Sequence, residues 1–278
     1  MTMSRRRWTD RLIEGLIALA AVLTALPVAL IFVTAFKPEA EIIRFDGVLP
    51  QDPTLGNFRH FLEYPEEAPI LRWLFNSVLV ASGATFLVLL VSSLAAFVLA
   101  RLRPTGGRWV LLGIIATLMV PGQVVFVPLY LLLSNLGLLD TYWALILPPA
   151  ASPFGVFLIY QFMKQVPYEI EEAARLDGCS DFQLYRHVML PLCRPVLATL
   201  GIFVFVGSWN DFLGPLIFLD SIDRYTLPVG VAIFQSSYAT DYGLTLAASV
   251  VCTLPVVVVF LLFSKHIVRG ISSGAVKG

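Results

Sequence analysis

The sequence predicts an all-α membrane protein that crosses a bilayer about six times. Hydrophobic residues make up 58% of the 278 positions and charged residues only 14%. Soluble globular proteins are usually nearer 45–50% apolar and about 25% charged. The charged residues also cluster between long apolar runs, which is the pattern of membrane spans and their connections. The formal net charge is zero, so overall charge does not suggest a nucleic-acid partner.

Six apolar runs are long enough to span, since a spanning helix needs roughly 20 mostly apolar residues. They are residues 12–36, 74–100, 109–133, 142–162, 196–219 and 243–263. Prolines inside these runs are tolerated in membranes when neighbouring helices satisfy the freed backbone groups. The first run follows a basic segment, as in a signal peptide, but it continues to Phe36. We therefore expect an uncleaved anchor.

The distribution of basic residues predicts the orientation. Fourteen of the 19 Lys and Arg residues lie in the N-terminal segment, in the connections after the second and fourth runs, and in the tail. These segments alternate along the chain, so they lie on one side of the membrane. Basic residues mark the cytoplasmic side. We expect both termini to be cytoplasmic.

The predicted chain is a single transmembrane domain, residues 1–278, with two notable connections. Residues 164–194 form a long cytoplasmic connection, called here the inner loop. Residues 220–242 form an external connection, called here the outer loop, which contains several aromatic residues, including Tyr238. A further external segment, 37–70, contains an amphipathic stretch.

The inner loop should fold as two short helices joined by a bend. Pro167 suits the first turn of a helix, where a missing N–H is harmless, and Gly178 suits a left-handed helix end. Ser180 or Asp181 can cap the second helix, and Pro191 is expected to stop it. On patterning alone, packing of this segment against the membrane or its own bundle is favoured over docking to another protein.

A spaced motif in the inner loop resembles the EAA motif of bacterial ABC importer permeases. That motif reads Glu-Ala-Ala, three residues, Gly, nine residues, Ile, any residue, Leu-Pro. The one departure here is Val188 in place of Ile. The matching residues are Glu172, Ala173, Ala174, Gly178, Leu190 and Pro191.

Further segments are similar to the carbohydrate-uptake branch of that family. They are residues 171–183, the run Trp209-Asn210-Asp211-Phe212 with Pro215-Leu216, and the terminal run 274–278. The resemblance is greatest to the G-type permease subunit of maltose and glycerol-phosphate importers. It implies the type I ABC importer permease fold in a bacterial inner membrane, with the inner loop as a coupling helix for a separate ATPase.

The resemblance also implies partners and site residues. The partners are a second permease, two ATP-binding subunits and an extracytoplasmic solute-binding protein, and the cargo is a carbohydrate. The implied coupling residues are Glu172, Ala173, Ala174, Asp177, Gly178, Leu190 and Pro191. The sequence lacks a GxxxxGK[ST] phosphate loop. We therefore expect a transport subunit without an ATPase site of its own, and not an enzyme. Its scattered Cys and His residues suggest neither a cofactor nor a metal.

Three residues in the fifth apolar run are candidates for the substrate pathway. Asn210 and Asp211 are polar residues within an apolar run, and such groups usually face an interior or a watery cavity. Trp209 could offer an aromatic face to a sugar. The alternative, of equal weight, places Trp209 in the interfacial aromatic belt and Asp211 near the outer headgroups.

Two other classes of function remain open on the residues alone. A secondary transporter driven by an ion gradient would have inverted repeats and intramembrane acidic or His relays, and only Asp211 fits. A membrane-embedded enzyme would need nucleophilic or metal-binding residues at membrane depth, and none stand out.

Overall fold

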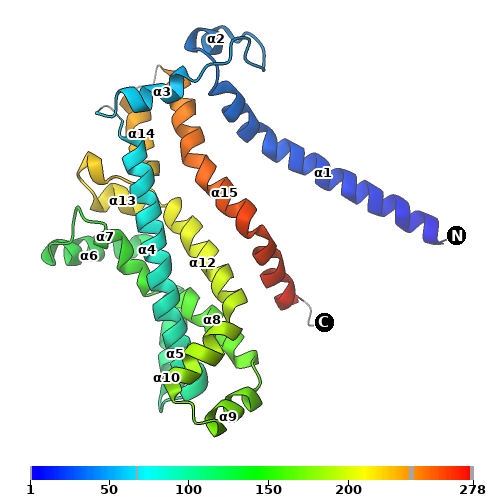
Figure 1. Cartoon of the computed structure of the whole chain (residues 1–278), viewed down its shortest axis with the longest axis vertical. Helices are drawn as coiled ribbons and strands as arrows, with labels where there is room; N and C mark the ends of the chain where they lie inside the picture. The colour runs from blue at the N-terminus through cyan, green and yellow to red at the C-terminus, as the bar shows by residue number, and fades with distance from the viewer. Residues whose placement is uncertain (1, 67, 238–240, 276–278) are drawn as a thin grey trace. The chain divides into compact units, whose positions relative to one another are not determined.

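The structure is a computed structural model that describes residues 2–66, 68–237 and 241–275 (Figure 1). Tyr238 and the end of the 274–278 run lie outside the described residues. Every regular element within these ranges is a helix, which confirms the all-α fold class. The chain divides into two compact units, Met1–Ile70 with Val231–Leu254 and Leu71–Gly230 with Pro255–Gly278. Each is described by itself.

The first unit contains α1 (Thr2–Thr34), α2 (Glu39–Arg44) and α3 (Gly56–Glu63), with the start of α15 (Tyr242–Ala275). The stretch Arg11–Thr34 of α1 is long and apolar enough to cross a membrane, and none of it is buried within the chain. Its apolar side chains therefore remain available to lipid or to another subunit.

Side chains connect α2, α3, α14 (Leu227–Ser237) and the start of α15 within this unit. The predicted amphipathic stretch forms α3, and Phe61 packs edge-on against Phe234, with ring centroids 5.7 Å apart. The Glu39 carboxylate accepts hydrogen bonds from the backbone N–H groups of Tyr242 (3.1 Å) and Gly243 (2.7 Å). A carboxylate at a helix N-terminus is favoured by the helix dipole, so Glu39 fixes where α15 begins.

The second unit is built along α4 (Ile70–Phe97), which continues as a π-helical stretch, η1 (Val98–Leu102). Together they form a candidate span of 33 residues. Five buried core residues from the helices around α4 and η1 are Ile159, Met163, Leu184, Met189 and Leu200. Leu184 and Met189 belong to the inner loop, so the inner loop forms part of this core.

Three of the predicted spans are bent or broken. Helices α5 (Gly107–Thr117) and α6 (Gly122–Asn135) meet at 101°. Helix α7 (Trp143–Ile146) with η2 (Pro148–Ala150) meets α8 (Pro153–Gln165) at 41°. Helix α12 (Arg194–Trp209) ends before α13 (Leu213–Phe218) begins.

The predicted runs 109–133 and 196–219 are therefore each formed by two helices with a break between them. Pro121 precedes α6 in an extended conformation, and a proline disfavours helical backbone in the residue before it. Among the residues that the structure describes, α1 and the α4–η1 helix are each long and apolar enough to span a membrane as single helices. Up to five spans result if each bent pair counts as one span. The sixth predicted run lies within α15.

Candidate coupling site

The first helix of the inner loop is α9 (Tyr168–Leu176), bounded as the sequence predicts. Pro167 precedes it with non-helical backbone, and acidic residues fill its first turn. Gly178 has φ +83°. Its N–H bonds to the Arg175 carbonyl, and the Cys179 N–H bonds to the Ala174 carbonyl, both at 3.0 Å. This pair of bonds is a Schellman motif, so the predicted bend at Gly178 is confirmed.

The second helix begins where the sequence predicts and ends later. Ser180 forms a capping box with Gln183, with hydrogen bonds of 2.8 and 3.3 Å. The helix continues through α10 (Asp181–Gln183), the π-helical η3 (Leu184–Met189) and α11 (Leu190–Leu192).

The expectation that Pro191 stops the second helix was wrong. The helix passes through Pro191, and the chain instead bends by 75° between α11 and α12. The π-helical stretch before the proline is a local adjustment of hydrogen bonding that lets the helix continue without one N–H.

A buried arginine holds α9 against the rest of the second unit. The Arg101 side chain is 0% exposed, and its Nη1 lies 3.7 Å from Glu171 Oε2. Its Nη2 donates to the Val166 carbonyl at 2.7 Å and also to the Met163 carbonyl. These carbonyls belong to the C-terminal end of α8, which is the negative end of the helix dipole. Arg101 therefore joins η1, α8 and α9 at one point.

Two further contacts stiffen the loop. The Tyr168 ring stacks below the Arg101 guanidinium, 4.7 Å from its Cζ to the ring centroid. Arg175 Nη2 bridges the two helices, 3.1 Å from Glu171 Oε1 and 2.9 Å from Asp181 Oδ1. Hydrogen bonds from Arg175 to Glu171 and Asp181 raise the pKa of Arg175. Arg175 thus links the helix before Gly178 to the helix after it.

The opposite face of α9 is exposed. Glu172, Ala173, Asp177 and Gly178 all lie at the surface. Leu176 is 89% exposed, an unusual position for a large apolar side chain. Ala174, by contrast, is buried against the core, and Glu171, one turn earlier on the helix, is buried as well.

Leu190 and Pro191 are half-buried at the base of the loop. Of the seven predicted coupling residues, four therefore share an open face and three face inward or form the base.

Sequence reasoning missed the residues that hold the loop in place. Glu171 and Arg175 are four positions apart on one helix, a spacing that favours an ion pair and could have revealed that contact. Arg101 lies 70 residues before Glu171, and no local pattern connects the two.

The candidate pathway residues occupy the break between α12 and α13. Trp209 is 1% exposed and stacks on Phe205, with ring centroids 6.0 Å apart. Asn210 and Asp211 are exposed. Asp211 Oδ1 accepts a hydrogen bond from the Gly214 N–H at 3.2 Å, at the start of α13. The structure thus places the two polar residues at a surface, whereas the tryptophan ring is packed inside.

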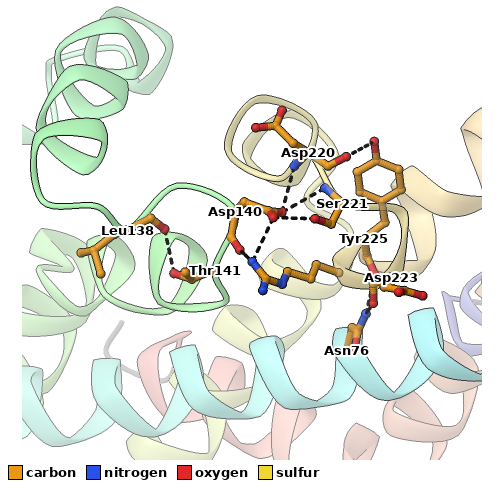
Figure 2. A network of polar contacts seen from close by, with 9 residues as sticks. Asn76, Leu138, Asp140, Thr141, Asp220, Ser221, Asp223 and Tyr225 are labelled. Carbon is orange, nitrogen blue, oxygen red and sulfur yellow. Dashed lines mark hydrogen bonds and ion pairs between the residues drawn. The ribbon is translucent and has the colours of Figure 1, made fainter.

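Near the N-terminal end of α4, the first part of the outer loop is clamped in place (Figure 2). Asn76 Nδ2 donates to the Asp223 and Tyr225 carbonyls, both at 2.9 Å, and Asn76 Oδ1 accepts from Tyr142 Oη at 2.7 Å. Asn76 and Arg101 are separated by 25 positions of one long helix, roughly 38 Å at 1.5 Å per residue. The two loops therefore lie about one membrane thickness apart.

Asp140 anchors the same segment (Figure 2). Its Oδ1 accepts from the Asp220 and Ser221 N–H groups at 3.1 and 3.0 Å, and its Oδ2 accepts from Ser221 Oγ at 2.5 Å. Arg224 Nη1 lies 2.9 Å from Oδ2. Burial raises the pKa of Asp140, but the hydrogen bonds from Ser221 and Asp220 and the Arg224 charge outweigh it. The pKa of Asp140 therefore lies below its ordinary value.

Comparison with known proteins decides the family. The model of the family described as "Binding-protein-dependent transport system inner membrane component" matches residues 89–273, well over half of the chain. The chain belongs to this family. The matched segment includes the whole inner loop and the α12–α13 break, so the candidate coupling site lies within the matched residues.

Several curated relatives of this permease family match nearly the whole chain. The arabinooligosaccharide transport permease AraQ of Halalkalibacterium halodurans is 35% identical over 94% of both chains. The diacetylchitobiose uptake permease NgcG of Streptomyces coelicolor is 35% identical over 94% of this chain and 87% of its own. The lactose transport permease LacG of Rhizobium radiobacter is 34% identical over 100% of both.

A solved structure confirms the permease fold. A chain of a bacterial ABC transporter that imports the acidic polysaccharide alginate superposes with a TM-score of 0.82. The superposition covers 93% of this chain and 96% of that one, at 21% sequence identity. The predicted ABC importer permease fold is therefore correct.

Proposed function

We propose that this chain is one of two permease subunits of an ATP-driven carbohydrate importer, in which α9 docks a separate ATPase subunit. Its family membership makes it an inner-membrane component of a binding-protein-dependent transport system. The relatives named above transport arabinooligosaccharides, diacetylchitobiose and lactose. A carbohydrate is the class of cargo that these names share.

The observation that carries the coupling role is the two-sided character of α9. Its inner face is fixed by Arg101 and Glu171, and its outer face exposes Glu172, Ala173 and Leu176. A helix that transmits force must be rigidly attached on one side and open to a partner on the other. Small Ala173 lets another backbone approach closely, while Glu172 offers a charge and Leu176 an apolar contact.

The contacts of Arg101 determine which helices would move together with α9. Arg101 lies at the end of the long α4–η1 helix and also holds the end of α8. Displacement of α9 by a closing pair of ATPases would therefore move both helices together. Such a rigid-body movement can switch the spans between inward-facing and outward-facing states.

ATP hydrolysis is assigned to the partner subunits. The sequence contains no GxxxxGK[ST] phosphate loop, which is the element that holds the phosphates in such ATPases. The other partners are a second permease and an extracytoplasmic solute-binding protein. A related solved complex contains a periplasmic protein loaded with an alginate pentasaccharide, which supports a loaded binding protein as the donor of cargo here.

We place the inner loop and both termini in the cytoplasm and the outer loop outside. The basic residues support this orientation, and so does the separation of the two loops along α4. Asn210 and Asp211 are proposed to line the pathway, since their polar groups are exposed at a break in an apolar helix. Trp209 is proposed to support that break by packing beneath it.

Reconstituted vesicles test this function. The complete transporter, made of this chain, a second permease, the ATPase and the binding protein, should accumulate a labelled oligosaccharide only when ATP is supplied. A protonophore should leave uptake unchanged. Uptake by this chain alone, driven by a proton gradient, would contradict the proposal and favour a secondary transporter.

A further inference from the structure

A small cavity lies beside the anchor of the inner loop, at the meeting point of η1, α5 and α8. Its volume is about 230 Å³. Its lining, called here the basic pocket, combines three cationic side chains with apolar and aromatic ones. These residues are Leu99, Ala100, Arg103, Pro104, Gly107, Arg108, Leu111, Tyr160 and Lys164.

The charge of the basic pocket is one-sided. Arg103, Arg108 and Lys164 are exposed, and the lining contains no carboxylate. Within the part of the chain that the structure describes, none of the three forms an ion pair. Arg103 and Lys164 instead lie over aromatic rings, those of Tyr168 (4.7 Å) and Tyr160 (5.7 Å). Three cations with no acidic partner create a local excess of positive charge that favours an anion.

The backbone adds to this preference. Helix α5 begins at Gly107, on the edge of the cavity, and the first N–H groups of a helix carry a partial positive charge. Arg103 has φ +47°, a left-handed conformation that ends η1. After η1 ends at this turn, Arg103, Pro104, Gly107 and Arg108 line the cavity.

The basic pocket lies at one end of a candidate membrane span. It adjoins Leu102, the last residue of the 33-residue candidate span. Trp109, in the first turn of α5, is 74% exposed, as expected for a residue of the interfacial aromatic belt. Beyond it, Val110 and Leu112 expose apolar side chains along α5. The cationic side chains of the pocket thus lie next to an exposed apolar surface of α5.

We propose that the basic pocket binds an anionic phospholipid, with the headgroup phosphate among Arg103, Arg108 and Lys164 and an acyl chain along α5. Basic pockets between membrane helices are suited to such headgroups. The pocket adjoins the Arg101 anchor, because Arg103 and Arg101 stack on the same Tyr168 ring. A bound lipid would therefore brace the attachment of α9. Assignment of this lipid to the cytoplasmic leaflet rests on the orientation proposed above, whereas binding itself does not.

Native mass spectrometry of the complete transporter tests the proposal. Detergent-purified complex is mixed with phosphatidylglycerol or with phosphatidylcholine, and retained lipid is counted. Wild-type complex should retain phosphatidylglycerol preferentially. Each basic residue near a membrane surface contributes about 1 kcal/mol. The double variant Arg108→Gln with Lys164→Gln should therefore lose at least about tenfold in phosphatidylglycerol affinity at low salt.

Three further variants distinguish binding in the pocket from a general effect of positive charge. Arg186→Gln with Arg194→Gln removes two exposed basic residues of the inner loop that lie outside the pocket and should leave retention unchanged. Gly107→Leu keeps every charge but adds bulk at a position whose Cβ would meet Pro104 at 3.4 Å and Leu99 at 3.6 Å. It should weaken retention, whereas Lys164→Arg should preserve it.

Three results would overturn the proposal. One is equal retention of phosphatidylglycerol by wild type and the Arg108–Lys164 variant. Another is an equal loss in the Arg186–Arg194 control. The third is complete displacement of the lipid by millimolar inorganic phosphate, which would identify a site for a soluble anion. Lipid binding can fail while ATP-driven uptake persists, so failure here is distinguishable from failure of the proposed function.

Discussion

Arg101 and Glu171 form a buried ion pair, with Nη1 and Oε2 3.7 Å apart, between the end of the α4–η1 helix and the first turns of α9. Glu171 also holds Arg175, and Arg101 also holds the carboxyl end of α8. The neighbouring acid, Glu172, has its side chain in solvent. Two adjacent glutamates thus have opposite surroundings, one fixed inside the protein and one open to a partner.

Removal of Arg101 should damage coupling through the attachment of α9 rather than through its exposed face. Breaking a buried ion pair by removing one partner costs about 3–5 kcal/mol. The loss should fall near the lower end here, because Arg175 remains as a partner for Glu171. Arg101→Met is expected to lower the thermal stability of the purified complex and to abolish sugar uptake.

The matching double variant provides the control for Arg101. In Arg101→Met with Glu171→Leu, no unpaired charge remains inside, so part of the thermal stability should return. If the effects of the two single variants on stability are simply additive, the pair does not act as one anchor.

Replacement of Gly178 should strain the bend. At φ +83° a β-branched residue is disfavoured, and the penalty for Gly178→Val is on the order of 1–3 kcal/mol. No atom lies within 4 Å of a built Cβ, so the effect should come from the backbone and not from a clash. Gly178→Asn is the matched control, because Asn tolerates this conformation.

Sugar uptake by vesicles containing Gly178→Val should fall, while Gly178→Asn should stay close to wild type. Both variants should reach the membrane at normal levels, which immunoblotting checks. Wild-type uptake by the Val variant would show that the bend is not needed for coupling.

The clamp on the outer loop should weaken in acid. The folded-state pKa of Asp140 lies below its ordinary value, so its ionised form stabilises the clamp above the unfolded pKa. This contribution is lost as the pH falls through the folded pKa. Hydrogen exchange of residues 219–225 should therefore accelerate below about pH 4, beyond the intrinsic pH dependence of exchange. In Asp140→Asn this added acid dependence should disappear.

The proposed orientation predicts the reporter pattern of fusions. Reporters at Thr105 and Gly278 should read cytoplasmic, and reporters at Gln51 and Ser237 should read external. An external reading at Gly278 would exclude an even number of spans.

The sequence predicted those features of the site that depend on residues close together in the chain. The bend at Gly178 and the capping role of Ser180 both follow from residues a few positions apart. The breaks at Pro121 and after Trp209 were missed because hydropathy measures length and polarity, and not direction. The Arg101–Glu171 pair depends on tertiary packing between distant segments. Pro191 shows the opposite case, in which a π-helical stretch overrides a strong local signal.

The most direct test of the account is charge reversal at Glu172. Glu172→Lys keeps the anchor on Arg101 intact but reverses the charge on the open face of α9, where it should repel a basic contact on the ATPase. The variant complex is compared with wild type for co-purification of the ATPase and for sugar uptake. Glu63→Lys, an exposed reversal on α3, is the control for co-purification. The account predicts that Glu172→Lys loses most of the bound ATPase and at least about tenfold in uptake, an order-of-magnitude effect for truncated or reversed interface charges. Full co-purification together with wild-type uptake would contradict the assignment of α9 as the coupling helix.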